Sequence, residues 1–202
     1  MKSKSEKFRL PVSRAATLIS LVFLCTTRSR WETNHEAVTT ILFFLATILV
    51  GVASLGRLWC SLYIAGFKNH RLITEGPYSL SRNPLYFFSS IGAIGLGLAT
   101  ETLTFPLAFI LMFFLYYPRV IKGEEKRLKQ LHGLEFDVYR NQVPAFFPKL
   151  KGFIEPETYS VKPVVFRRHV LDAVWFIWIL GIIELVEGLK EIGVLPALWA
   201  LY

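Results

Sequence analysis

The sequence predicts an all-α protein, a polytopic bundle of about five membrane helices, and two observations lead to this fold class. Of its 202 residues, 53% are hydrophobic and only 19% are charged, a balance that soluble domains of this size rarely carry. Apolar runs recur along the chain without the alternation of a strand, and several approach the roughly 20 residues needed to cross a bilayer. We therefore expect one domain in which the membrane helices pack together.

The predicted membrane helices are the apolar runs at residues 12–26, 37–67, 85–100, 103–117 and 170–189. The first run follows a basic head, but Arg14 interrupts it and no small-residue cleavage site follows. We therefore expect a retained first helix rather than a cleaved signal. The first, third and fourth runs are short for a spanning helix, so tilt or a half-membrane hairpin would change the count of spans.

The distribution of Lys and Arg predicts which helix ends face the cytosol. Most basic residues fall in 68–82 and 119–168, whereas the turn around Glu101 has none. Cytosolic segments carry the excess of Lys and Arg, so we expect both basic segments on the cytosolic side of a bacterial inner membrane or an endomembrane. This topology also accounts for the formal net charge of +8, so no nucleic-acid partner is expected.

Three isolated side chains within the apolar runs are expected to be structural. Arg57 should snorkel or meet a polar partner, because an unpaired charge deep in lipid is costly. Cys25 and Cys60 are expected to pack in the bundle. No CxxC pair and no His/Cys cluster occurs in the sequence, so neither a disulfide framework nor a metal site is predicted.

A cytosolic helix is predicted at residues 118–133, continuing from the membrane. Pro118 suits the first helical position and Gly133 suits the C-terminal cap. Apolar residues recur at spacings of three and four on one face, and Glu124 lies on that face together with Leu128. Glu125 is turned about 100° away from it.

The chain divides into three parts of one integrated domain. Residues 1–66 are predicted to hold the N-terminal membrane helices, 67–150 the core with the functional motifs, and 151–202 a polar linker and a C-terminal membrane helix. Within the core, residues 136–150 should begin as a short helix that Pro144 and Pro148 stop, which suits a cap over a site.

The loop at residues 70–86 is the first candidate for chemistry, because polar, aromatic and basic residues gather there between two membrane runs. Its turn residues would let Tyr78, Arg82 and Tyr86 line one pocket. Taken alone, however, Arg82 is equally explained as a cytosolic anchor and the tyrosines as an interfacial belt. The Glu124-Glu125 pair alone is likewise explained as a solvated helix face beside Lys and Arg.

Together the two motifs are more specific. Leu-Ile-Thr-Glu-Gly-Pro-Tyr, then Arg-Asn-Pro-Leu-Tyr, a helical hairpin, Glu-Glu-x-x-Leu, Gly-x-x-Phe-x-x-Tyr and Val-Pro occur in this order over residues 67–150. This order resembles the isoprenylcysteine carboxyl methyltransferase and phospholipid methyltransferase superfamily. The resemblance implies a helical membrane enzyme in which S-adenosylmethionine binds at the cytosolic face, between the loop and the Glu-bearing helix.

The resemblance also implies the site residues. Arg82 and Arg119 are the candidate catalytic residues, each for binding a carboxylate of substrate or cofactor. The isoprenylcysteine branch usually has His where Asn83 stands, and its substrate-binding Arg falls on Val120, next to Arg119. The implied cofactor contacts are His70, Leu72, Ile73, Tyr78, Asn83, Pro84, Leu85, Tyr86 and Glu124, with Glu124 at the polar end of the cofactor.

The function predicted from the sequence is methyl transfer from S-adenosylmethionine to a lipid-like or prenylated acceptor that enters sideways from the bilayer. The acceptor group is left open among carboxylate, amine, thiol and phosphate. Two alternatives remain: an NADPH-dependent reductase of the sterol-reductase type, whose C-terminal Tyr and Pro pattern is similar, and a non-enzymatic membrane scaffold. A scaffold or channel would be expected to carry polar residues along its spans, not in two cytosolic segments.

Overall fold

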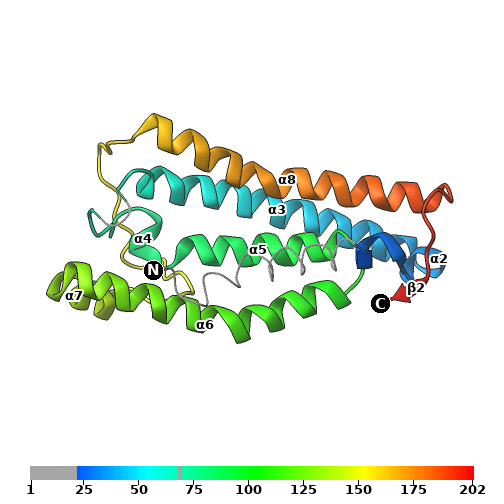
Figure 1. Cartoon of the computed structure of the whole chain (residues 1–202), viewed down its shortest axis with the longest axis horizontal. Coiled ribbons are helices and arrows are strands. Elements are labelled where there is room, and N and C mark those ends of the chain that lie inside the picture. Colours follow the sequence, from blue (N-terminus) through cyan, green and yellow to red (C-terminus); the bar gives the residue numbers. More distant parts are fainter. Residues whose placement is uncertain (1–21, 68–69) are drawn as a thin grey trace, which may run out of the picture.

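The computed structural model describes residues 22–67 and 70–202, which are mostly helical (Figure 1). The predicted helix at 12–26 lies outside the described residues except for its end, 22–26, which is helical. The elements are β1 (Thr27–Ser29), α2 (Trp31–Asn34), α3 (Glu36–Ile64), α4 (Pro77–Leu80), α5 (Pro84–Leu98), α6 (Thr104–His132), α7 (Leu134–Gln142), α8 (Pro163–Glu191) and β2 (Trp199–Leu201).

Three helices of the described ranges are long and apolar enough to cross a membrane: α3, α6 and α8, each of 29 residues. Helix α5 is apolar but has only 15 residues, which at about 1.5 Å per residue falls short of the roughly 30 Å of hydrocarbon. Phe44 on α3, Phe114 on α6 and Trp178 on α8 are 63%, 71% and 65% exposed. Such apolar faces fit a lipid environment, and the count of about five spans stays a prediction.

The four long elements lie side by side, with α3 between α8 and α5, and α6 beyond α5 (Figure 1). Small residues allow the close approach of α5 to its neighbours. A Cβ atom on Gly95 would lie 3.0 Å from the Leu49 Cβ, and one on Gly92 would lie 2.4 Å from the Phe176 ring. Helix α5 therefore packs against both α3 and α8.

Helix α6 corrects one prediction and confirms another. Pro118 lies inside the helix and does not begin it, so its predicted first-turn position was wrong. A proline in a helix leaves the carbonyl four residues earlier without its N–H donor. The helix continues because backbone groups of an apolar segment have no better partners than their own helix. At its other end Gly133, with φ 53°, terminates α6 as predicted, and α7 follows at once.

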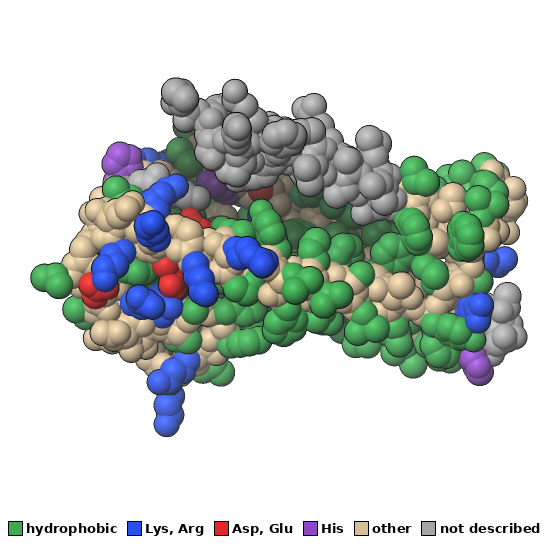
Figure 2. Space-filling view, turned by 60° about the horizontal axis from the view of Figure 1, so that its bottom comes forward, with side chains coloured by type: hydrophobic (Ala, Val, Ile, Leu, Met, Phe, Trp, Pro, Cys, Tyr) green, Lys and Arg blue, Asp and Glu red, His purple; other side chains and the backbone are tan. Residues whose placement is uncertain are grey.

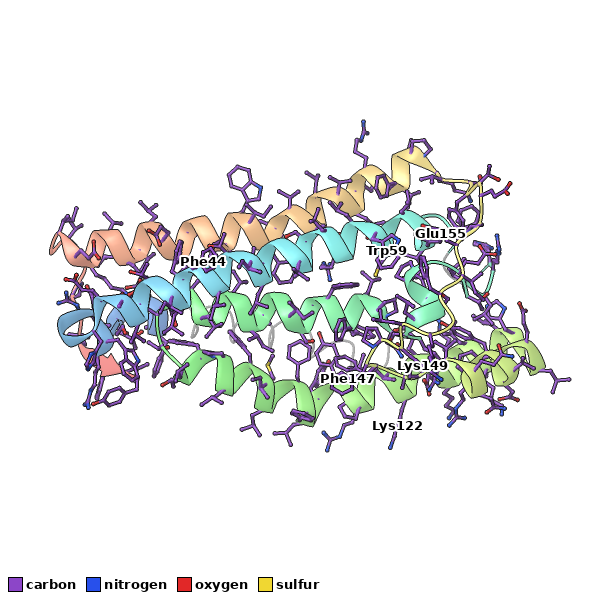
Figure 3. All side chains as sticks on the ribbon, turned by 180° about the vertical axis from the view of Figure 1, so that it is seen from behind. Phe44, Trp59, Lys122, Phe147, Lys149 and Glu155 are labelled. Carbon is purple, nitrogen blue, oxygen red and sulfur yellow. The ribbon has the colours of Figure 1, made fainter. Side chains whose placement is uncertain are left out.

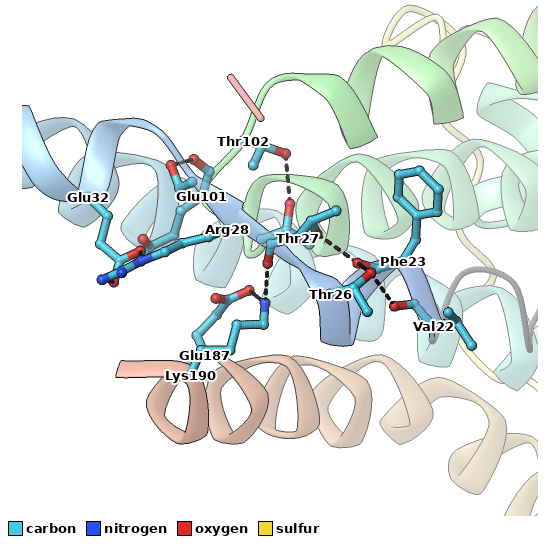
Figure 4. Close-up of polar contacts among 12 residues, drawn as sticks. Val22, Phe23, Thr26, Thr27, Arg28, Glu32, Glu101, Thr102, Glu187 and Lys190 are labelled. Atoms are coloured by element: carbon cyan, nitrogen blue, oxygen red, sulfur yellow. Dashed lines mark hydrogen bonds and ion pairs between the residues drawn. The ribbon is translucent and has the colours of Figure 1, made fainter. Parts of the chain in front are cut away.

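Two short strands depart from the all-α prediction. Strands β1 and β2 pair in parallel, with Thr27 opposite Trp199 and Ser29 opposite Leu201. Segments of three residues are too short to show strand alternation in a sequence. At this end the buried Lys190 Nζ donates to the Thr27 carbonyl at 2.6 Å and to a Glu187 carboxylate oxygen at 2.8 Å (Figure 4). These bonds tie α8 to β1.

The opposite end of the molecule carries α4, α7 and the loop at 70–83, and we call it the basic end. Figure 2 shows Lys and Arg side chains gathered over this end, while hydrophobic side chains cover the middle of the molecule. The two basic segments of the sequence thus meet at one end of the bundle. The predicted motifs lie there too.

Candidate functional site

A cavity of about 450 Å³ opens at the basic end, bounded by α3, the loop before α5, α6, α7 and α8. The loop and the start of α5 supply Arg71, Leu72, Ile73, Tyr78, Arg82, Asn83, Pro84, Leu85, Tyr86 and Ser89. The other helices supply Arg57, Ser61, Ile64, Tyr117, Glu124, Leu128, Tyr139, His169 and Asp172. We call it the polar cavity.

Most of the predicted site residues line the polar cavity. These are Leu72, Ile73, Tyr78, Arg82, Asn83, Pro84, Leu85, Tyr86 and Glu124. His70 and Arg119 are exposed and are not among the lining residues. A guanidinium nitrogen of Arg119 donates instead to the Leu115 carbonyl within α6. The structure therefore brings the loop motif and the glutamate helix together around one space.

The loop is held in place by the segment at 139–149, which runs beside it. The Tyr139 hydroxyl donates to the Tyr78 carbonyl at 2.7 Å, and the Asn83 side-chain amide donates to the Ala145 carbonyl at 2.9 Å. The Lys149 N–H donates to the Leu80 carbonyl at 2.9 Å. Gly-x-x-Phe-x-x-Tyr and Val-Pro thus support the loop, because they place Tyr139 and the following turn against it.

Arg82 makes several of the contacts that hold the loop in place. Its Nε and Nη2 lie 2.8 and 2.7 Å from one carboxylate oxygen of Glu125, and Nη1 donates to the carbonyls of Arg140 and Val143. The side chains of Arg82 and Glu125 are only 10% and 15% exposed. Arg82 therefore joins the loop to α6 and α7, and its predicted role in binding a carboxylate of substrate or cofactor stays a prediction.

Glu124 makes a different contact from its neighbour Glu125. Its carboxylate accepts a hydrogen bond of 2.8 Å from the Tyr86 hydroxyl. The Tyr86 ring meets the Tyr117 ring edge to face, with centroids 5.1 Å apart. Because consecutive helix residues point about 100° apart, the two glutamates reach different partners: Glu124 contacts Tyr86 in the first turn of α5, and Glu125 contacts Arg82 in the loop before it.

Tyr78 has a buried hydroxyl that forms no hydrogen bond within the described residues. The side chain is 6% exposed, and burial raises the pKa of Tyr78 well above its ordinary value, so the hydroxyl remains protonated. Leaving a buried donor unsatisfied costs about 1–3 kcal/mol. Tyr78 is also one of the residues that line the polar cavity.

Several lining residues were not predicted as site residues. Arg57 carried a weak signal, a charge inside an apolar run, and was expected to be structural. His169 and Asp172 lie on α8, in a region for which the sequence suggested no chemistry. In residues 22–67 and 70–202, no group of three or more His, Cys, Asp or Glu side chains is arranged to hold a metal ion.

Comparisons with known proteins identify the family. A family model described as phospholipid methyltransferase matches residues 14–135. The chain belongs to this family. The family predicted from the loop and Glu-Glu motifs is thereby confirmed, and relatives named as isoprenylcysteine methyltransferases support the same superfamily. The cavity residues His169 and Asp172 lie beyond the matched range.

Three relatives illustrate the range of similar proteins. The nickel-cobalt-cadmium resistance protein NccN of Alcaligenes xylosoxydans xylosoxydans is 37% identical over 94% of this chain and 88% of its own length. The cobalt-zinc-cadmium resistance protein CzcN of Cupriavidus metallidurans is 38% identical over 95% of this chain and 87% of its own. Protein-S-isoprenylcysteine O-methyltransferase B of Arabidopsis thaliana is 24% identical over 72% of this chain and 75% of its own length. No solved structure shows a significant match.

Taken together, the family and the three spanning helices indicate a membrane methyltransferase. Two of its relatives are named for resistance to metals, so the family description and the names of these relatives describe different properties.

Proposed function

We propose that the protein transfers a methyl group from S-adenosylmethionine to a lipid-like acceptor. The observation that carries this proposal is the Glu124–Tyr86 contact in the wall of the polar cavity. It joins the two motifs of the family at a space large enough for a ligand, since small-molecule sites range over about 300–1,000 Å³.

The lining residues suit S-adenosylmethionine. When bound, this cofactor supplies a methyl group already activated on a sulfonium. Its ammonium and sulfonium are cationic, and a carboxylate at Glu124 with aromatic rings at Tyr86 and Tyr117 is a set of groups that attracts cations. The unsatisfied Tyr78 hydroxyl offers a donor to one of its acceptor atoms. We infer that these four residues hold the cofactor.

The roles of the residues follow from the chemistry of such a transfer. The protein has to align the two reactants and exclude water, and a carboxylate or phosphate acceptor needs no proton removed. Tyr86 orients the Glu124 carboxylate through its hydroxyl, and the apolar side chains of Leu72, Ile73 and Leu85 exclude water from the cavity. Arg82 and Asn83 keep the loop in place through the segment beside it.

A lipid-like acceptor is supported by a second cavity of about 480 Å³ between α5, α6 and residues 145–147. We call it the apolar groove. Its lining is Ser90, Ile94, Ile110, Phe113, Phe114, Tyr117, Pro118, Ile121, Lys122, Glu125, Ala145, Phe146 and Phe147, and Figure 3 labels Phe147 and Lys122. Tyr117 lines both cavities, and Phe114 is 71% exposed on the outer face of α6. An apolar chain in the groove would bring its head group toward the polar cavity.

We also infer that the basic end faces the cytosol, since cytosolic segments carry the excess of Lys and Arg. In a bacterium this orientation would place the polar cavity at the inner surface of the cytoplasmic membrane. S-adenosylmethionine is made in the cytosol, so the inferred orientation and the proposed cofactor agree.

The test is calorimetric titration of the detergent-purified protein with S-adenosylhomocysteine and, separately, with NADPH. We expect micromolar binding of S-adenosylhomocysteine alone. A hydrogen bond to a charged group is worth about 1.5–3 kcal/mol, so Glu124→Gln should weaken binding roughly 10- to 100-fold. Tyr86→Phe should weaken it less, and the matched control Tyr116→Phe, at an α6 tyrosine that is 54% exposed, should not change it.

Two results would contradict the proposal. If the protein binds NADPH but not S-adenosylhomocysteine, it is a reductase and not a methyltransferase. If it binds neither, a scaffold is favoured. Equal affinities of the Tyr86→Phe and Tyr116→Phe variants would show that the polar cavity is not the cofactor site.

A further inference from the structure

Arg57 differs from the other arginines of the polar cavity in having no carboxylate partner among the residues that the structure describes. Arg82 lies 2.7 Å from Glu125, and Arg71 lies 3.1 Å from Glu75. No described carboxylate lies within ion-pair distance of Arg57, which lines the same cavity. A guanidinium charge within a membrane helix is costly when unpaired, so its position calls for an anionic partner.

The contacts of Arg57 fix the position of the guanidinium but leave one of its N–H donors without an acceptor among the described residues. One terminal nitrogen, Nη1, donates to the Ser89 hydroxyl on α5, and the central carbon lies 5.5 Å from the centroid of the Phe176 ring on α8. The Nε hydrogen is buried and has no acceptor among the described residues. A guanidinium binds a carboxylate or phosphate through two parallel N–H groups, and Arg57 is among the residues that line the polar cavity.

The depth of Arg57 suits the head group of a membrane amphiphile. It lies seven residues before the end of α3 at Ile64, which is about 10 Å along the helix axis. The residues of the cavity nearer the basic end include Arg71 and Leu72, whereas Ser89, the partner of Arg57, is one turn inside α5. Arg57 is therefore at the membrane side of the polar cavity.

The charges of the cavity are arranged with opposite signs on different helices. Glu124 on α6 and Arg57 on α3 both line it. On α8, Asp172 lies 3.6 Å from His169, and its side chain is 66% exposed, so solvent screens its charge. A cationic methyl donor near Glu124 and an anionic acceptor near Arg57 would each meet a complementary charge.

We propose that Arg57 binds the anionic head group of the methyl acceptor, so that the acceptor is an amphiphile with a carboxylate or phosphate oxygen. This inference rests on the proposed function and narrows it, because an amine acceptor has no use for the guanidinium. Arg57 is thus the residue that selects the charge of the head group. Ser89 and Phe176 position it.

The experiment uses full-length protein in a neutral detergent and three probes with the same chain: dodecyl phosphate, dodecanoate and dodecan-1-ol. The wild-type protein should bind one or both anionic probes at least tenfold more tightly than the alcohol. Arg57→Met should remove this preference, and Arg57→Gln, which keeps hydrogen-bond donors without the charge, should do the same. Arg167→Met loses the same charge at an exposed residue of α8 that does not line the cavity, and it should retain the preference.

Each outcome is decisive. Equal anion affinities of the Arg57→Met and Arg167→Met variants would overturn the inference, as would a wild-type protein that binds dodecan-1-ol as tightly as the anions. If Arg57→Met does not fold, the Arg57→Gln variant decides the same question. S-adenosylhomocysteine titrations of the same samples test the proposed function separately, since Arg57→Met should leave that affinity within about threefold of wild type.

The two anionic probes distinguish a carboxylate acceptor from a phosphate acceptor. A preference for dodecanoate would indicate a carboxylate acceptor, such as a lipidated peptide end or a fatty acid. A preference for dodecyl phosphate would indicate a phospholipid head group or a lipid phosphate. Either preference supports a role for Arg57 when Arg57→Met abolishes it.

Discussion

Replacement of Arg82 by Met should separate a structural role from a ligand-binding one. The side chain is 10% exposed and its bonds reach Glu125 and two carbonyls of the α7 region. Breaking a buried ion pair on one side costs about 3–5 kcal/mol, because the remaining charge stays buried without a partner. At roughly 2–4 °C per kcal/mol for a chain of this size, the unfolding temperature should fall by about 10 °C.

The assay is thermal unfolding in detergent without ligand, followed by circular dichroism. The double variant Arg82→Met/Glu125→Met removes both charges and should recover part of the loss, since no unpaired carboxylate remains. Affinity for S-adenosylhomocysteine is measured at a temperature where each variant is folded. An Arg82→Met variant that unfolds at the wild-type temperature but no longer binds the ligand would refute the structural role and favour a direct contact with a carboxylate.

Three further predictions follow from single side chains. Tyr78→Phe removes an unsatisfied buried hydroxyl, so the unfolding temperature should stay the same or rise while S-adenosylhomocysteine binds several-fold more weakly in calorimetry. Burial and the nearby Glu187 carboxylate raise the pKa of Glu101 from 4.5 to about 7. The protonated carboxyl therefore stabilises the fold fully below about pH 4.5, and this contribution, about 1 kcal/mol after solvent screening, is lost as pH rises through 7. Thermal unfolding of Glu101→Gln between pH 5 and 8 should lack that part of the pH dependence. Gly76→Ala should lower the unfolding temperature, because φ is 58° and the new Cβ would lie 2.4 Å from the Tyr63 ring, whereas Gly123→Ala, with nothing within 4 Å, should not.

The membrane class and the positions of the long helices could be predicted from the sequence because they depend on local composition. The apolar runs at 37–67 and 170–189 correspond to α3 and α8, and the run at 103–117 is the first part of α6. Gly133 was predicted as a helix end because a residue with positive φ is easiest for glycine. Pro118 was misplaced because proline statistics favour a helix start, while an apolar helix keeps its own hydrogen bonds through a proline.

The candidate site could be predicted in part, for a similar reason. The loop at 70–86 and Glu124 carry a recognisable order of residues, and that order can be read without knowing the contacts. Arg57, His169 and Asp172 do not belong to any such ordered motif. They reach the polar cavity only because α3 lies between α5 and α8, an arrangement that depends on side-chain packing across more than one hundred residues of chain.

By itself, then, the sequence determined that the chain is a helical membrane protein, where its basic segments lie, and which family its motifs belong to. These properties follow from hydropathy, charge and residue order, which are local. The tertiary structure alone decided that Glu125 pairs with Arg82 while Glu124 meets Tyr86, and that Arg57 has no carboxylate partner within the described chain. Such pairings depend on which helix faces meet, and the periodicity of one helix does not specify the face of its neighbour.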